Sequence, residues 1–450
     1  MIIQISDHFT LGRLVRYTAP AALMMVCTSV YGIVDGLFVS NCVGVESFAA
    51  LNLIYPFIMM LSALGYMFGT GGTALVAKTM GEGNQQRANG LFSMLVAVTF
   101  AAGIVCGAIV FVFVRPVGQL MGASGNLLEE AVVYGSILAF SLPFLMLQVS
   151  FQSYLAAAGK PKAGLAVEIV AGIANIVLDA VLIVGCGWGL AGAAVATAVS
   201  EVLGGALPML FFVGKRAGAM RLTRPQLEWR LLGKACLNGS SELVTNISMS
   251  LVAMLYNYQL MIYLGSDGVA AYGVIQYVMW IFGSMFMGYS VGASPLVSYQ
   301  YGAKNKVELS SLFKKSLMII GVLGVALTAA ALLFGRPMAA LFVGYDESVL
   351  ELTVHALSIY SFVFLLMGFS MFGSAFFTAL NNGLVSALIS FLRTLVFECG
   401  AVMLLPLFFG EMGIWSSIIV AECMSVIITT VFLVALRKHY GYAGKIEEAK

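Results

Sequence analysis

Charged side chains are scarce in this chain. Only 10% of its 450 residues are Asp, Glu, Lys or Arg, whereas 60% are hydrophobic. A water-soluble domain of this length needs more polar side chains to cover its surface. The composition therefore excludes a soluble globular protein and indicates a protein embedded in a membrane.

Motifs typical of enzymes and metal centres are also missing. The seven cysteines are scattered singly without a CxxC pair, and small apolar packing residues are their expected role. The three histidines lie far apart, and HExxH does not occur. We therefore expect no enzyme, no cofactor and no metal centre, and the net charge of +2 gives no indication of nucleic acid.

Long apolar runs fill the chain instead. A helix that spans a bilayer needs about 20 apolar residues. Twelve such stretches are predicted, at about 14–40, 48–77, 91–114, 131–158, 163–185, 190–213, 235–262, 268–298, 312–335, 351–380, 384–408 and 412–437. We expect an all-α protein of twelve transmembrane helices in the lipid bilayer.

Lys and Arg residues gather on one side of these helices. The N-terminus, the even-numbered loops and the C-terminal tail hold 20 of the 23, which are Arg13, Arg16, Lys78, Arg87, Lys160, Lys162, Lys215, Arg216, Arg221, Arg224, Arg230, Lys234, Lys304, Lys306, Lys314, Lys315, Arg437, Lys438, Lys445 and Lys450. Because positive residues stay on the cytoplasmic side, both termini are predicted to be cytoplasmic. The expected location is the plasma membrane of a prokaryote.

The two halves of the chain repeat each other at a spacing of 221 residues. Matching pairs are Leu75 and Leu296, Gly81 and Gly302, Arg115 and Arg336, Ser153 and Ser374, Gly192 and Gly413, and Glu201 and Glu422. Six helices per repeat make the two lobes parallel about an axis along the membrane normal. The expected organisation is a lobe at 1–213, a cytoplasmic linker at 214–234, and a second lobe with its tail at 235–450.

Buried acids break this symmetry. Asp35 falls opposite Tyr256, and Asp179 falls opposite Gly400. At a rise of about 1.5 Å per residue, Asp35, Asp179 and Thr197 lie roughly 8–10 Å below the outer surface on three helices of the first lobe. Ionisable residues inside a bilayer are costly and usually functional. One lobe is therefore expected to carry an ionisable site that the other lacks.

Polar neighbours accompany both acids. Tyr31 and Asn175 each precede an acid by four residues and share its helix face. Two close carboxylates in a medium of low dielectric constant cannot both stay ionised cheaply, so one is expected to hold a proton. With the oxygens of Asn175 and Thr197, the same residues can also form a Na+ site at Asp35 and Asp179.

Further polar residues are predicted to line a central cavity. They are Gln148, Gln152, Glu201, Glu242 and Arg393. For Glu201 a packing role remains an alternative, and for Glu242 a place at a polar helix start. Glu398 lies five residues after Arg393, so both need partners elsewhere. Pro20 removes a backbone hydrogen bond from the first helix, where a kink can couple protonation of Asp35 to bending.

These residues resemble a known family. The run from Pro20 through Tyr31-Gly-Ile-Val-Asp35, the run Asn175-Ile-Val-Leu-Asp179, and Pro295-Leu-Val297 are similar to MATE (multidrug and toxic compound extrusion) transporters, in particular to their DinF/MepA-like branch. The resemblance implies a V-shaped, two-lobed monomeric antiporter. It would export amphipathic, often cationic drugs or metabolites in exchange for H+ or Na+ by alternating access.

Other functions fit the sequence less well. A lipid-linked oligosaccharide or precursor flippase of the same superfamily is the alternative, but it would favour a basic cavity, and only Arg393 is a basic residue within the membrane. The Asp-Arg loop signature of major-facilitator transporters is absent from 78–90. The acids that the NorM-type branch uses on its helices 7 and 10 have no convincing match.

Overall fold

The computed structural model describes residues 5–121, 123–214, 220–225, 227–344 and 346–442. Lys215, Arg216, Lys445 and Lys450 of the predicted cytoplasmic set lie outside these residues. Helices account for nearly the whole described chain, and those of the first half are α1 (Leu11–Phe38), η1 (Val39–Val43), α2 (Val45–Gly81), α3 (Gln85–Leu120), α4 (Gly125–Ala157), α5 (Pro161–Asp179), η2 (Ala180–Gly185) and α6 (Gly189–Val213).

The second half repeats this pattern with fewer breaks between helices. Its elements are α7 (Trp229–Gly302), α8 (Lys306–Val343), α9 (Glu347–Tyr360), η4 (Ser361–Val363), α10 (Phe364–Ala379), α11 (Gly383–Phe391), η5 (Leu392–Glu398) and α12 (Cys399–Tyr440). η1, η2 and η5 are π-helical, and η4 is a 3-10 turn.

Two glycines divide the long helices α7 and α12 into separate spans. Gly265 and Gly410 have φ angles of 63° and 57°, in the left-handed region that favours glycine. Their mates at a spacing of 221 are Gly44 and Gly189, which also have positive φ and connect the corresponding helices of the first half. The described chain therefore contains twelve spans in two six-helix repeats, as predicted.

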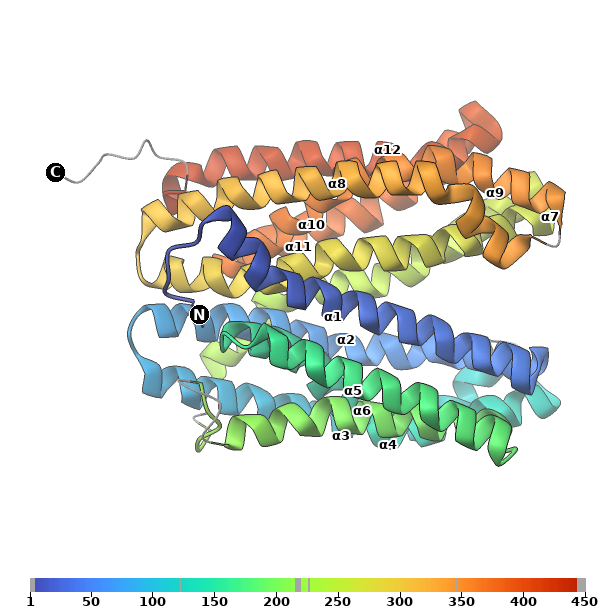
Figure 1. Cartoon of the computed structure of the whole chain (residues 1–450), viewed down its shortest axis with the longest axis horizontal. Helices are drawn as coiled ribbons and strands as arrows, with labels where there is room; N and C mark the ends of the chain where they lie inside the picture. The colour runs from blue at the N-terminus through green and yellow to red at the C-terminus, as the bar shows by residue number, and fades with distance from the viewer. Residues whose placement is uncertain (1–4, 122, 215–219, 226, 345, 443–450) are drawn as a thin grey trace.

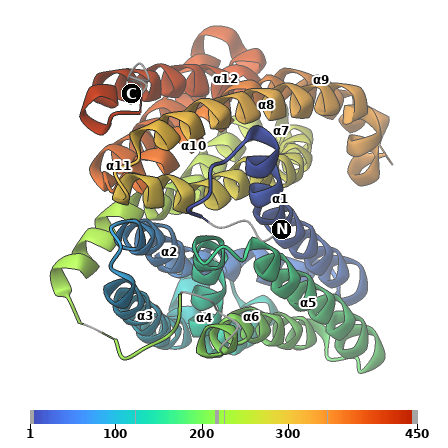
Figure 2. The same ribbon diagram turned by 60° about the vertical axis from the view of Figure 1, so that its left-hand side comes forward.

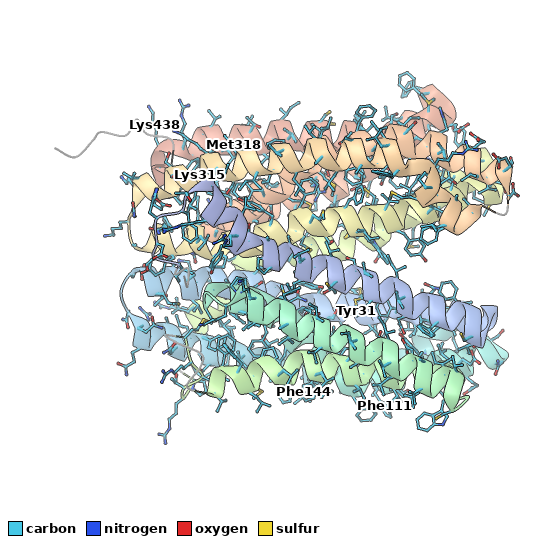
Figure 3. All side chains as sticks on the ribbon, in the orientation of Figure 1. Tyr31, Phe111, Phe144, Lys315, Met318 and Lys438 are labelled. Atoms are coloured by element: carbon cyan, nitrogen blue, oxygen red, sulfur yellow. The ribbon has the colours of Figure 1, made fainter. Side chains whose placement is uncertain are left out.

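The two repeats form two lobes that lie side by side. Figure 1 shows α2 to α6 in one half of the view and most of α7 to α12 in the other, with α1 running between the two groups, and Figure 2 shows the same division after rotation. The described chain begins and ends at the same end of the molecule (Figure 1), and Lys315 and Lys438 lie at this end as well (Figure 3). Large apolar side chains such as Leu333, Phe408 and Phe140 are about three-quarters exposed, which suits a surface in contact with lipid.

Equivalent helices of the two repeats also share the same N-cap residue. Asn84 accepts a hydrogen bond from the backbone of Arg87, and its mate Asn305 accepts one from Glu308, so equivalent helices begin with the same cap. The segment between α6 and α7 is held on the first lobe, where Arg87 donates two hydrogen bonds to Glu228 at 3.2 and 2.8 Å. These bonds keep the pKa of the Glu228 carboxyl below its usual range.

The lobes touch at the end that carries the termini. A methyl group placed on Gly302 would lie 2.1 Å from the carbonyl oxygen of Lys78, and one placed on Gly81 would lie 2.1 Å from that of Tyr299. Gly81 and Gly302 are repeat mates, and so are Lys78 and Tyr299. The contact therefore follows the two-fold symmetry of the repeat, with backbone packed directly on backbone.

Candidate functional site

The two acids of the first lobe lie at the ends of their helices. Asp35 is three residues from the end of α1, and Asp179 is the last residue of α5. The π-helical segments η1 and η2 follow these helices and contact each other. Both acids therefore lie beside irregular backbone. π-Helical turns are rare, and they occur frequently at functional sites.

The two carboxyl groups lie close enough to interact, and three of their four oxygens lack a hydrogen-bond partner among the described residues. The charge of Asp35 acts on Asp179 across the gap between α1 and α5. Oδ1 of Asp35 and both carboxyl oxygens of Asp179 are buried without a hydrogen-bond partner among the described residues. An unpaired buried carboxylate is costly. The arrangement therefore suits a pair that takes up a proton or a small cation.

More unpaired oxygens belong to the predicted neighbours. Oδ1 of Asn175 and Oγ1 of Thr197 are buried, and neither has a partner in the part of the chain that the structure describes. Tyr31, labelled in Figure 3, packs on α5, where a methyl group on Gly172 would lie 3.2 Å from its ring. Carboxylate, amide and hydroxyl oxygens are ligands for hard cations, so the donor set fits Na+. The described residues contain no cluster of three His, Cys, Asp or Glu.

Sequence reasoning missed two residues beside this pair. Tyr134 on α4 is fully buried and lies close enough to Asp35 and Asp179 to interact with both electrostatically. Its hydroxyl has no partner among the described residues. Ser141, two turns further along α4, donates a 2.5 Å hydrogen bond to Glu201. Neither residue carried a signal in the sequence, because one Tyr among 18 and one Ser on an apolar helix are not distinctive.

A separate polar cluster surrounds Glu168 on α5. Its carboxylate accepts hydrogen bonds from Gln152 at 2.8 Å, from Gln148 at 3.1 Å and from Thr28 at 3.3 Å. Glu168 is 2% exposed. Gln148 and Gln152 were predicted to face the cavity, and this is wrong for the conformation described, because both side chains point into the lobe to satisfy Glu168.

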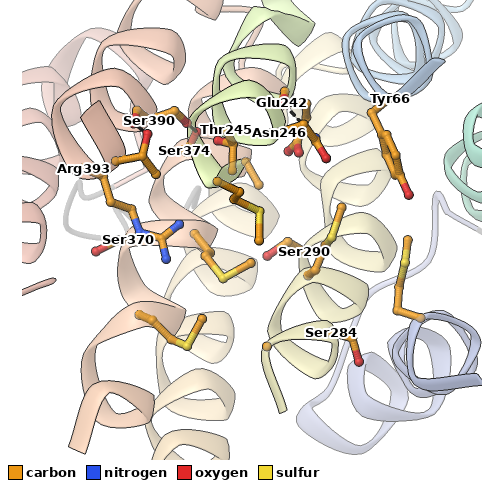
Figure 4. A pocket seen from close by; sticks show the side chains of 18 of the residues that line it. Tyr66, Glu242, Thr245, Asn246, Ser284, Ser290, Ser370, Ser374, Ser390 and Arg393 are labelled. Atoms are coloured by element: carbon orange, nitrogen blue, oxygen red, sulfur yellow. Dashed lines mark hydrogen bonds between the residues drawn. The ribbon is translucent and has the colours of Figure 1, made fainter. Parts of the chain in front are cut away.

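A central cavity of about 340 Å³ lies between the lobes. The first lobe contributes a smaller part of its wall, including Met25, Thr28, Ser29 and Tyr66, and the second lobe contributes most of it. Figure 4 shows hydroxyl groups and methionine sulfur atoms around this space. Six methionines line it, which are Met25, Met249, Met279, Met287, Met367 and Met371. Flexible thioethers adapt to ligands of varied shape.

Every charged residue that lines the cavity, within the described chain, comes from the second lobe. Glu242, Arg393 and Glu398 form this set. The role of Glu242 and Arg393 as substrate-cavity residues stays a prediction. Arg393 pairs with Glu422, whose Oε1 lies 2.6 Å from both Nε and Nη2. Glu201 was also expected here, but it lies within the first lobe beside Ser141 and does not line the cavity.

In the second lobe, an aromatic ring occupies the position that corresponds to Asp35. Tyr256, the mate of Asp35, is fully buried and stacks on Tyr272 with ring centroids 4.9 Å apart. Gly400, the mate of Asp179, has open space where a side chain would start. The asymmetry between the repeats is therefore built into the packing. Pro20 lies inside the continuous helix α1, and a kink at this position stays a prediction.

With this geometry established, comparison with known proteins identifies the family. The family model MatE matches residues 20–181 and 243–400, which is one segment in each lobe. The chain belongs to the MatE family. It is a family of membrane transporters, and the chain is similar over 94% of its length to the multidrug export protein MepA of Staphylococcus aureus, at 23% identity and 93% coverage of that protein.

Solved MATE structures share the fold. A MATE transporter in the straight conformation superimposes with a TM-score of 0.90 at 22% identity, covering 96% of this chain and 98% of that one. An outward-facing multidrug resistance MATE transporter of the MOP superfamily gives 0.87 at 23% identity, with the same coverage of both chains. These likenesses confirm the two-lobed fold of this MatE member.

Proposed function

We propose that this MatE protein is a secondary active exporter of amphipathic, often cationic organic compounds, driven by inward movement of H+ or Na+. The name of the similar MepA protein supports export of several drugs. The cavity supports it as well, because methionine and aromatic side chains surround two carboxylates, Glu242 and Glu398, and one guanidinium. Such a wall binds varied apolar bodies that carry a charged group.

Energy coupling is assigned to the first lobe. One observation carries this proposal: Oδ1 of Asp35 and both carboxyl oxygens of Asp179 are buried without hydrogen-bond partners among the described residues, and the two carboxyl groups lie close enough to interact. A proton or Na+ removes the cost of burying the pair, and its release restores that cost. Asn175, Thr197 and Tyr31 are proposed to complete the site.

Helix α1 connects the cation site to the cavity. It carries Asp35 near one end and Met25, Thr28 and Ser29 in the cavity wall. Thr28 and Asp35 are seven residues apart, which places them on the same helix face at a separation of about 10 Å. A shift of α1 on cation binding therefore changes the cavity wall. If cation binding weakens drug binding, the drug weakens cation binding by the same factor, because linkage is reciprocal.

The conformation fits one step of an alternating-access cycle. The lobes touch at the end that holds the termini, through Gly81 and Gly302, and the cavity lies beyond this contact. With the termini on the cytoplasmic side, as the positive residues predict, this is the outward-open form of a monomer in the plasma membrane. A flippase for pyrophosphate-linked lipids is less favoured, because acids outnumber Arg393 in the cavity wall.

Transport of a fluorescent cationic dye into or out of proteoliposomes tests the proposal. We expect dye movement against its gradient when a pH gradient or a Na+ gradient is imposed, and the effective gradient identifies the coupling ion. Asp35→Asn should lower gradient-driven transport at least tenfold while dye binding remains. Glu129→Gln, an exposed acid of the same lobe that pairs with Arg115, serves as the matched control and should transport normally.

Two results would contradict this function. Absence of dye movement under either gradient, in protein that binds the dye, would exclude a cation-driven exporter. Full gradient-driven transport by well-folded Asp35→Asn would remove the first-lobe site from the mechanism, even if export itself persists.

A further inference from the structure

The segment ahead of α1 lies on the second lobe, although α1 itself packs on α5 of the first. This segment consists of residues 5–10, and we call it the N-terminal strap. Phe9 is fully buried and Ile5 is 8% exposed, and both belong to an apolar cluster with Leu296 of α7 and Leu312 of α8. Figures 1 and 2 both show the strap, in dark blue, beside α7 and α8.

A buried acid in the first turn of α8 binds the strap. Glu308 is 4% exposed. Its Oε1 accepts a hydrogen bond from the backbone amide of Phe9 at 2.9 Å, and its Oε2 lies 2.5 Å from Nδ1 of His8. Lys315, two turns further along α8, donates to the carbonyl oxygen of Phe9. Hydrogen bonds to charged groups are stronger than neutral ones, so polar contacts add to the apolar ones in holding the strap.

Tyr17 of α1 extends this connection to the first lobe. Its ring contacts that of Phe9 edge to face, with centroids 5.7 Å apart. Its hydroxyl donates a 2.5 Å hydrogen bond to the carbonyl oxygen of Ala156, near the end of α4. Glu308, Phe9, Tyr17 and Ala156 therefore form a chain of contacts from one lobe to the other. The lobes can move apart at this end only when one of these contacts breaks.

The segment ahead of α7 uses the equivalent positions of the opposite lobe. The mate of Glu308 at a spacing of 221 is Arg87 on α3, which binds Glu228, the residue before α7. The mate of Lys315 is Met94, whose sulfur accepts from the backbone amide of Glu228 at 3.3 Å. The segment that leads into each lobe is therefore held by the other lobe, at the same place in the repeat.

The two crossings differ in what holds them. The segment between α6 and α7 joins the lobes covalently in every conformation. Its Arg87–Glu228 pair is 47% and 34% exposed, and exposed ion pairs contribute little to stability. The strap is held on the second lobe by non-covalent contacts, and these are buried around Phe9 and Glu308. The strap can therefore detach, and its attachment is the stronger of the two polar contacts.

We propose that the N-terminal strap is a releasable clamp that keeps the lobes closed at the end carrying the termini, and that it leaves Glu308 when this end opens. The inference rests on the proposed alternating-access cycle and adds to it a contact that sets the balance between its states. Because α1 also carries Asp35 near its other end, the strap and the proposed cation site act on opposite ends of one helix.

Two distances between spin labels test the clamp in the full-length protein, in a background without the seven native cysteines. Labels at Lys162 of α5 and Lys314 of α8 report the separation of the lobes. Labels at Ser6 of the strap and Lys438 of α12 report whether the strap is attached to the second lobe. All four residues are exposed. Both distances are measured at acidic and neutral pH, and with and without Na+ and a cationic dye.

Variants on both sides of the contact should favour the open state. Glu308→Ala should raise the ratio of open to closed molecules at least tenfold, which is the effect of losing a hydrogen bond to a charged group. Phe9→Ala should act in the same direction from outside any helix, so the test does not depend on the integrity of α8. Glu308→Gln keeps an oxygen for the Phe9 amide and should restore part of the closed population. Arg87→Ala, at the repeat mate, is the control and should change the ratio at most about fivefold.

Each outcome decides for or against the clamp. A selective shift in Glu308→Ala and Phe9→Ala, with a longer distance from Ser6 to Lys438 in the open molecules, supports it. An unchanged ratio in both variants, or an equal shift in Arg87→Ala, overturns it while alternating access stands. Open molecules whose strap remains attached overturn it as well. A single lobe distance in the unaltered protein under every condition overturns both the clamp and the proposed cycle.

Discussion

The lobes contact each other through Gly81 and Gly302, and this contact predicts a large effect of Gly302→Ala on the conformation. The added methyl would lie 2.1 Å from the carbonyl oxygen of Lys78, whereas real contacts of this kind are essentially never under 3.0 Å. The backbones must therefore separate by about 0.9 Å, the difference between these two values, before the alanine fits. In a conformation with this end open, the same methyl has no carbonyl to meet.

The size of the effect follows from the cost of overpacking. Forcing an extra methyl into a packed interface costs about 1–3 kcal/mol. Because this cost applies only to the state closed at this end, the equilibrium should shift about 5- to 150-fold towards the open state. Gly81→Ala should act in the same way through Tyr299. The double variant should shift the equilibrium by less than the sum, since one separation of the backbones relieves both clashes.

Spin labels across the two lobes measure this shift. Lys162 on α5 and Lys314 on α8 are exposed at the same end of the molecule, and labels there report the distance between the lobes in a background without the seven native cysteines. Gly273→Ala on α7 is the control, because a methyl at that position meets nothing within 4 Å. If Gly302→Ala and Gly273→Ala give the same distance distribution, the steric reasoning is refuted.

Two further changes test the polar contacts of buried acids. Glu308→Ala removes the acceptor of the Phe9 amide, which is bound at 2.9 Å, so hydrogen exchange at that amide should accelerate about tenfold while exchange in the spans stays unchanged. Acceleration throughout the chain would instead indicate general unfolding. Glu168→Leu leaves the amides of Gln148 and Gln152 without an acceptor, which should destabilise the protein by about 1–3 kcal/mol for each. An unchanged melting temperature would show that these amides find other partners.

The sequence was sufficient for the architecture. Hydropathy located all twelve spans, because burial in lipid requires apolar residues on every face and this requirement is visible without any contact information. The observed helices extend beyond the predicted stretches, as α3 does by starting at Gln85 instead of at 91. The polar residues at their ends continue each helix into the membrane–water interface, where hydropathy does not identify a helix.

The sequence was less informative about the orientation of side chains. Helix α4 is apolar around its whole circumference, so nothing in its pattern shows which face Gln148 and Gln152 occupy. For the same reason, the sequence did not show that Tyr134 lies beside the acid pair. For Arg393 the spacing showed that its partner lies on another helix, but 29 residues separate it from Glu422, and only the packing of η5 against α12 reveals the pair. The coupling role of Asp35 and Asp179 stays a prediction.

The stacking of Tyr256 on Tyr272 has a consequence for how the sequence of this protein can evolve. Where the first lobe has Asp35, the second lobe has Tyr256 in an aromatic stack that reaches the cavity, because Tyr272 is both part of the stack and part of the lining. The acid pair and most of the cavity wall thus lie in different copies of the repeat. Under the proposed function, substitutions in the second lobe can adapt the cavity wall to new compounds without altering the acid pair of the first lobe.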